Sequence, residues 1–126
     1  MIVDTDVIIW YMRGNERART ILEKLTTFSI SVISNMELIQ GMRNKTELRE
    51  LRKAFNEWRV NVVFINEIIS AKALFLMEKH YLAHSLMLAD ALIAATAASC
   101  GMPLLTGNTK HYRMITDMEI RKFTPR

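Results

Sequence analysis

The sequence opens with MIVDTD at residues 1–6, a short apolar run followed at once by two aspartates, Asp4 and Asp6. Far along the chain, Asp90 lies within another apolar stretch, LADALIAATAA at residues 88–98. Three of the four aspartates therefore adjoin apolar sequence instead of charged surface. An ionised carboxylate in apolar surroundings is unfavourable unless it is paired or bound to a cation. We therefore expect these acids to hold a divalent metal ion.

The composition is that of a globular protein, and 126 residues are enough for one domain, residues 1–126, with a substantial core. The net charge of +4 is compatible with a polyanionic partner but does not establish one. Cys100 is the only cysteine, so no internal disulfide is expected, and its alanine-rich surroundings predict a packed thiol. No basic leader or membrane-length apolar segment is evident, which predicts a soluble cytoplasmic protein.

Short apolar strands alternate with segments of helical periodicity. This order predicts a mostly parallel central sheet with helices on both faces, a three-layer α/β/α sandwich. The expected strands are residues 2–3, 28–33, 60–65 and 102–106, with a possible edge strand at 118–120, and the expected helices are residues 7–12, 16–26, 34–42, 46–58, 67–81 and 85–100.

Polar residues follow three of the expected strands: Asp4 follows the first, Ser34 to Glu37 the second, and Thr106 to Asn108 a later one. Because sites in parallel sheets form outside the carboxyl ends of the strands, we expect these residues to converge. Simpler interpretations exist. Either early aspartate could cap the next helix, and Ser34 with Glu37 has the spacing of a capping box.

Asp90 is the acid with the weakest structural explanation. With Ser85 as the expected N-cap, Asp90 lies beyond the first helical turn, where the benefit of the helix dipole fades. A buried salt bridge to one of the Lys or Arg residues is the alternative to a metal site. Thr106 and Asn108 either form a turn before a short helix or help to orient water at the metal.

Other charged and metal-binding residue types have ordinary explanations. His80 and His84 are four residues apart, as in some zinc sites, but no third ligand is nearby, so a solvated pair is expected. His111 has no metal-ligand spacing with either of them, so it is expected to support the site ligands from behind or to be structural. One basic cluster is either a solvated helix with internal ion pairs or a track for an RNA backbone, and comprises Arg43, Lys45, Arg49, Arg52, Lys53 and Arg59.

Four stretches, in order and spacing, resemble a PIN domain, and more closely a VapC-type toxin of bacterial and archaeal toxin–antitoxin pairs. They are IVDTD at residues 2–6, Ser34-x-x-Glu37, ADALIAATA at residues 89–97 and LLTGNTKHY at residues 104–112. Together they span nearly the whole chain.

The resemblance implies an α/β/α sandwich and an endoribonuclease that depends on Mg²⁺ or Mn²⁺, in which a metal-activated water attacks the RNA phosphodiester. It also implies a small antitoxin partner that covers the active site, and commonly a homodimer. By motif match, Asp4, Glu37 and Asp90 form the metal-binding acidic triad. Asn108 joins them where many relatives carry a fourth acid. Asp6, Thr106 and Ser34 are expected to support the site.

Two other functions fit parts of the sequence. Asp4-Thr5-Asp6 behind a strand also resembles the first motif of haloacid-dehalogenase-type phosphatases, in which the first aspartate is the nucleophile. Those enzymes need a late pair of acids, and only Asp117 and Glu119 follow Asn108 here. The other possibility is a PIN domain that binds RNA or protein without cleaving.

Overall fold

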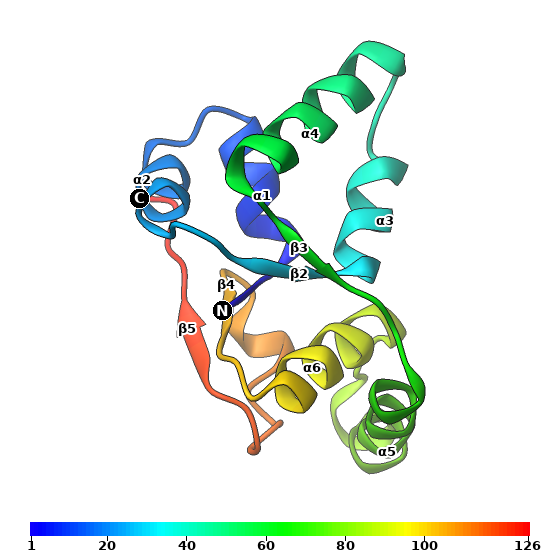
Figure 1. Ribbon diagram of the computed structural model, residues 1–126. Coiled ribbons are helices and arrows are strands. Elements are labelled where there is room, and N and C mark those ends of the chain that lie inside the picture. Colours follow the sequence, from blue (N-terminus) through cyan, green and yellow to red (C-terminus); the bar gives the residue numbers. More distant parts are fainter.

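Five short strands form one sheet at the centre of the protein in a computed structural model that describes residues 1–126 (Figure 1). The strand order is β3-β2-β1-β4-β5, and every neighbouring pair is parallel. The strands are β1 (Ile2–Val3), β2 (Ser29–Ser31), β3 (Asn61–Val63), β4 (Leu104–Thr106) and β5 (Ile120–Lys122). The predicted parallel α/β architecture is confirmed.

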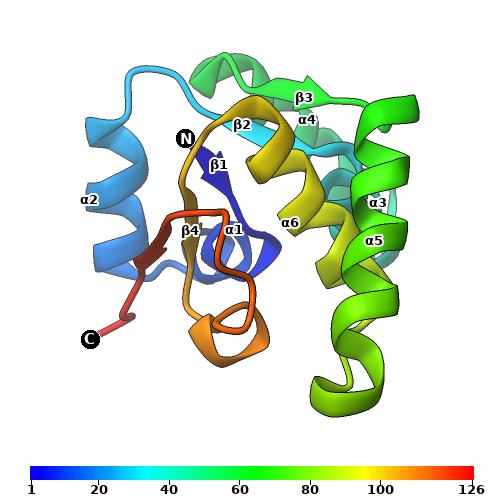
Figure 2. The same ribbon diagram turned by 90° about the horizontal axis from the view of Figure 1, so that it is seen from below.

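Helices cover both faces of this sheet. Helices α5 and α6 lie on one side, and α1, α2, α3 and α4 lie towards the other (Figures 1 and 2). The bounds are α1 (Thr5–Met12), α2 (Glu16–Lys24), α3 (Val32–Gln40), α4 (Lys45–Trp58), α5 (Glu67–His84) and α6 (Leu88–Cys100), with a 3-10 turn, η1 (Thr109–His111), after β4. The three layers are those expected from the sequence. No helix is both long and apolar enough to span a bilayer.

The two central strands divide the apolar side chains between two cores. Successive side chains of a strand point to opposite faces of a sheet. Ile2 and Leu104 accordingly join the core beneath α5 and α6, whereas Val3 and Leu105 join the core beneath α1, α2 and α4. All four are at most 5% exposed. Both faces of the sheet are therefore buried, which explains why these strands are uniformly apolar.

Strand β1 lies at the point where the strand order changes direction, because β2 pairs on one side and β4 on the other. The Asp4 N–H donates to the Leu105 carbonyl over 2.9 Å, so the carboxyl ends of β1 and β4 lie side by side. In open parallel sheets this crevice is where ligands bind. Asp4 and Thr106 are located there.

Helix α3 begins earlier than the sequence suggested. Its N-cap is Ser31, whose hydroxyl accepts from the Ile33 N–H over 3.1 Å, and Ser34 lies buried inside the helix. The predicted capping box of Ser34 and Glu37 is therefore wrong. The β-branched residues after Ser31 have strand propensity, but burial of Val32 in the helix overrides it.

Helix α6 begins later than expected, at Leu88, with Met87 as an N-cap that has no side-chain hydrogen bond. Ser85 instead ends α5 in a left-handed conformation, with φ of 54°. Asp90 therefore lies in the first turn of α6, and the predicted position beyond that turn is wrong. The helix ends at Cys100, as predicted, and Gly101 is its C-cap with φ of 64°.

The thiol of Cys100 is exposed, so the prediction of a packed thiol is also wrong. Cys100 is the last residue of α6, and the buried alanines of that helix lie one turn earlier. Cys100 shares its face of the helix with Ala97, but it lies at the end of α6, where Ser99 is exposed as well.

The capping of α3 can be tested by replacing two serines in turn. Ser31→Ala should destabilise the protein by about 1 kcal/mol, since it removes an N-cap acceptor. Ser34→Ala should cost less, because the Ser34 hydroxyl is buried without a hydrogen-bond partner. Urea unfolding measures both free energies. A larger loss for Ser34→Ala than for Ser31→Ala would contradict the assignment.

Candidate active site

Asp4 is the most enclosed acid of the site and is only 4% exposed. Its Oδ1 accepts from the Thr5 N–H over 2.8 Å. Its Oδ2 accepts from the Thr106 hydroxyl over 2.7 Å and from the Tyr112 hydroxyl over 3.0 Å. Asp4 is also the N-cap of α1, so the capping interpretation and the site interpretation hold together.

Tyr112 joins Asp4 to Asp90. Its hydroxyl lies 3.0 Å from Asp4 Oδ2 and 3.2 Å from Asp90 Oδ1. Burial, followed by the charges of the two acids, raises the pKa of Tyr112 above its ordinary value, so the phenol keeps its proton. One proton can serve only one of the two carboxylates at a time. Tyr112 therefore holds both acids at the same point without neutralising either.

Glu37 reaches the site from α3 through the neighbour of Asp4. The Thr5 hydroxyl donates to Glu37 Oε1 over 2.8 Å. Glu37 is also close enough to Asp90 for its charge to raise the Asp90 pKa. The three acids predicted to form the triad therefore lie around one region, although Glu37 contacts Asp4 only indirectly.

Asp6 lies against the loop that follows β4. Its Oδ2 accepts from the Gly107 N–H over 2.9 Å, and its Oδ1 is buried without a partner. A Cβ at Gly107 would come within 2.6 Å of Asp6 Oδ2 and 3.4 Å of the Phe123 carbonyl oxygen. Glycine is therefore required here for the close approach of the loop to Asp6.

Asp4, Asp6, Glu37 and Asp90 form the acid cluster of the site. Thr106 and Asn108 mainly shape the loop that follows β4. The Thr106 hydroxyl donates to Asp4 and accepts from the Asn108 N–H over 3.0 Å. Asn108 precedes η1, but its side chain does not cap that turn. Ser34 is buried with an unpartnered hydroxyl and contributes no hydrogen bond to the acids.

Burial raises the pKa of three acids of the site, and the charge of Asp4 adds to this effect at two of them. Burial and then the charge of Asp4 raise the pKa of Asp6 to about 6. Burial and then the charge of Asp4 raise the pKa of Asp90. Burial also raises the pKa of Asp4, although the hydrogen bond from Thr106 acts to lower it. Such shifts are expected where carboxylates are gathered without a balancing cation.

No lysine or arginine neutralises these acids. The five salt bridges lie elsewhere, except that His111 Nδ1 is 3.4 Å from Asp90 Oδ2. The atoms that could bind a cation here are carboxylate and hydroxyl oxygens, which suit a hard cation such as Mg²⁺. They include Oδ1 of Asp6, which has no hydrogen-bond partner. No three acidic, histidine or cysteine side chains are arranged as a ready-made metal cage. Mg²⁺ needs only one or two direct carboxylates, because it retains several waters.

The other predicted features lie outside the acid cluster. His80 is buried and His84 exposed, so the expectation of a solvated pair is wrong for His80. Burial lowers the His80 pKa, and the two rings lie 5.9 Å apart with no third ligand. The basic cluster on α4 is exposed, and its Arg43 pairs with Glu47 over 2.7 Å.

Apart from Thr5, which adjoins Asp4 in the sequence, Tyr112 and Gly107 are the site residues that sequence reasoning missed as neighbours of the acids. Both stand in the stretch from Leu104 to Tyr112, which was recognised for its Thr106 and Asn108. A tyrosine is most often a core residue, and nothing local indicates that its hydroxyl meets two distant aspartates. Only the pairing of β1 with β4 reveals that arrangement.

Taken together, the fold and this site define a parallel α/β sandwich with clustered acids at the carboxyl ends of two central strands. The family model described as "PIN domain" matches residues 1–115. The chain therefore belongs to the PIN domain family.

Individual relatives cover nearly the whole chain. "Ribonuclease VapC10" of Mycobacterium tuberculosis is 36% identical over 123 residues, which are 94% of this chain and 90% of that protein. Among solved structures, a toxin–antitoxin complex from Klebsiella pneumoniae has a chain that is 28% identical with a TM-score of 0.75, covering 99% of this chain and 97% of its own. VapBC-1 from nontypeable Haemophilus influenzae is 26% identical with a TM-score of 0.80, covering 96% of each chain.

These comparisons do not favour the phosphatase alternative. Its required late acids are also engaged elsewhere: Asp117 pairs with Lys72 of α5, and Glu119 pairs with Arg121 over 3.2 Å. Neither is available to Asp4.

The bridging hydroxyl can be tested with Tyr112→Phe in protein treated with a chelator. Loss of a buried donor to Asp4 and Asp90 should lower the free energy of unfolding by about 1–3 kcal/mol. Tyr81→Phe, at a tyrosine that is 51% exposed, is the matched control and should have little effect. Equal effects of the two substitutions on urea unfolding would rule out the bridge.

The raised pKa of Asp6 predicts that the free energy of unfolding depends on pH. This pKa is about 6 in the folded protein and near 3.8 when unfolded, so the folded state binds the extra proton between these values. Stability without metal should therefore fall as the pH rises from about 4 through about 6. Asp6→Asn should flatten this fall, because the amide does not ionise. Unfolding free energies measured across that range with a chelator decide it, and an unchanged slope in Asp6→Asn would contradict the assignment.

Proposed function

We propose that this protein is a Mg²⁺- or Mn²⁺-dependent endoribonuclease and the toxin of a toxin–antitoxin pair. The observation that carries the proposal is the gathering of Asp4, Glu37 and Asp90 at the carboxyl ends of β1 and β4 with no lysine or arginine to neutralise them. The name of the mycobacterial relative supports RNA as the substrate, and the two solved complexes support an antitoxin partner.

Asp4, Glu37 and Asp90 would hold the metal ion, with Asp6 next to them as a further source of negative charge. When bound, such an ion makes its water easier to deprotonate and stabilises charge on the phosphate. Without the ion, the same carboxylates repel an RNA backbone. Cleavage should therefore require both the acids and the cation.

The surrounding residues position these acids. Thr106 and Tyr112 donate to Asp4, which fixes its orientation and favours its ionised form. The hydrogen bond from the Thr5 hydroxyl fixes the orientation of Glu37. Asp6 anchors Gly107 and thereby the loop that carries Asn108. Asn108 would face the substrate or its water from this loop, a role that its motif position implies.

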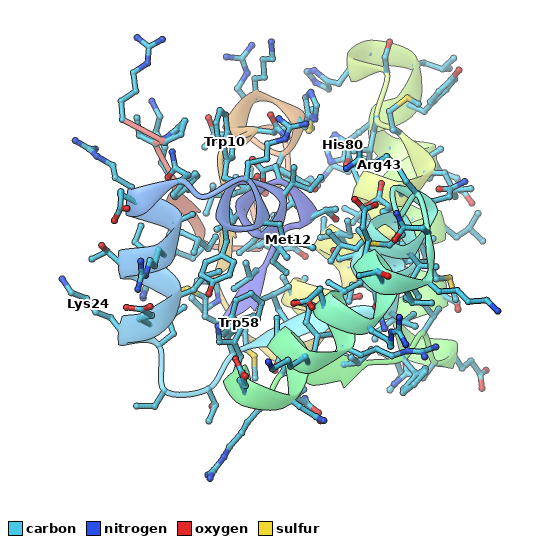
Figure 3. All side chains as sticks on the ribbon, turned by 90° about the horizontal axis from the view of Figure 1, so that it is seen from above. Trp10, Met12, Lys24, Arg43, Trp58 and His80 are labelled. Atoms are coloured by element: carbon cyan, nitrogen blue, oxygen red, sulfur yellow. The ribbon has the colours of Figure 1, made fainter.

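This protein has an apolar cavity beside Glu37 in which the antitoxin would bind. A cavity of about 610 Å³ between α1, α3 and α4 has Glu37 on its wall. Its apolar lining comes from Ile9, Met12, Leu38 and Met42. Figure 3 shows Met12 on α1 and Arg43 on the segment that joins α3 to α4. An antitoxin segment with apolar side chains would fill this cavity and reach the acids.

Helix α5 offers a separate apolar surface on which a second copy of the chain would pack. Ile68, Phe75 and Leu82 are seven residues apart, so they lie on one face of the helix, and they are 71%, 53% and 94% exposed. This exposed stripe supports the homodimer that the family resemblance implies. It lies on a different helix from the walls of the antitoxin cavity.

The activity test compares the wild-type protein with Asp4→Asn and Asp90→Asn, purified without antitoxin. Transfer RNA and ribosomal RNA are incubated with and without Mn²⁺, and the cleavage products are resolved on gels. Each substitution should reduce cleavage by roughly 100-fold or more, because it removes charge that holds the cation. Chelation should abolish cleavage by the wild-type protein.

Asp117→Asn is the control, since Asp117 is an aspartate that pairs with Lys72 away from the acid cluster. It should cleave as the wild type does. Circular dichroism checks that every variant is folded. Cleavage by folded Asp90→Asn at the wild-type rate would reject the proposed role of the acids, and metal-independent cleavage would reject the proposed chemistry.

A further inference from the structure

A small cavity beside Asp90 has basic side chains at four of the eight residues that line it. Its volume is about 250 Å³, and its wall includes His84, Lys110, His111 and Arg113 around the single carboxylate of Asp90. The residues come from two separate parts of the chain, the end of α5 and the turn η1 with its next residues. The fold, not a local run of charge, brings them together.

This cavity adjoins the acid cluster through Asp90. Asp90 lines it, and His111 Nδ1 lies 3.4 Å from Asp90 Oδ2. The other Asp90 oxygen accepts from Tyr112, whose hydroxyl also reaches Asp4. A ligand in the cavity would therefore lie next to whatever the acids hold.

The cations of this cavity are free to bind a ligand. Lys110 and Arg113 are exposed, and neither takes part in a salt bridge. By contrast, Arg43 on the α4 side is paired with Glu47. An arginine and a lysine without carboxylate partners are suited to hold a phosphate group.

The cavity on the other side of the acids has the opposite balance of charge. Around Glu37, its carboxylates Glu37, Glu47 and Glu50 outnumber its cations Arg13 and Arg43. A polyanion approaching the acid cluster would be repelled on that side and attracted on the side of Lys110 and Arg113. The charges therefore favour a polyanion that leaves the acid cluster on the side of Lys110 and Arg113.

The start of α6 adds to this preference. Ser85, Leu86 and Met87 line the cavity, and Met87 is an N-cap without a side-chain hydrogen bond. The first N–H groups of a helix carry partial positive charge and favour anions. This contribution is secondary to the two free cations.

We propose that this cavity is a phosphate subsite, in which Lys110 and Arg113, with His84 and His111, hold the backbone phosphate of an RNA strand next to the one being cleaved. The subsite rests on the proposed ribonuclease function. It gives the strand one path, from the acid cluster towards the end of α5 and away from α4. The basic cluster on α4 is then not the RNA track.

The test measures binding of a fluorescent single-stranded RNA oligonucleotide by anisotropy, in chelator so that no cleavage occurs. The double variant Lys110→Gln/Arg113→Gln should bind about tenfold more weakly than the wild type. The slope of log affinity against log salt should decrease by roughly 0.7 for each RNA phosphate that the variant no longer neutralises. In Mn²⁺, the KM for cleavage should rise more than kcat falls.

Lys45→Gln/Arg49→Gln on α4 removes the same charge and is the matched control. It should change binding less than the first pair does. Equal losses of affinity for the two pairs would show a general charge effect and overturn the subsite, as would an unchanged affinity for Lys110→Gln/Arg113→Gln. If the wild type neither binds nor cleaves RNA with Mn²⁺, the proposed function fails together with the subsite. If the wild type cleaves RNA but Lys110→Gln/Arg113→Gln binds it as tightly as the wild type does, the subsite alone is rejected.

Discussion

The hydroxyl of Tyr112 lies between Asp4 and Asp90, two acids that are far apart in the sequence. Because the phenol is buried and keeps its proton, it holds both carboxylates at one point while leaving their charge in place. Thr106 and Thr5 complete the arrangement from β4 and α1. The proposed cation site and the proposed phosphate subsite are both defined relative to these two acids. The cavity proposed for the antitoxin has Glu37, the third acid, on its wall.

Much of the architecture follows from local sequence. The pairs Ile2-Val3 and Leu104-Leu105 are wholly apolar because both faces of the sheet are covered, and that pattern predicts buried parallel strands. Asp4 was recognisable because a carboxylate directly after such a strand must lie at its carboxyl end. Glu37 and Asp90 were recognisable through the family resemblance, and the fold brings both towards Asp4.

Other features depend on tertiary interactions that no local pattern contains. Ser31 and Ser34 are equally good caps by residue type, and only the packing of Val32 decides between them. Ser85 has the residue type of an N-cap, yet it ends the preceding helix. The role of Tyr112 depends on the pairing of β1 with β4, which joins residues about a hundred positions apart.

That same pairing has a consequence during synthesis of the chain. Strand β1 is translated about a hundred residues before its partner β4 and the tyrosine that links the acids. Interactions this distant in sequence form only after the intervening chain is available. A nascent chain therefore carries Asp4 and Glu37 long before it can assemble the pocket. A hydrolytic centre that would endanger the translating cell therefore stays incomplete until β4 and Tyr112 have been made.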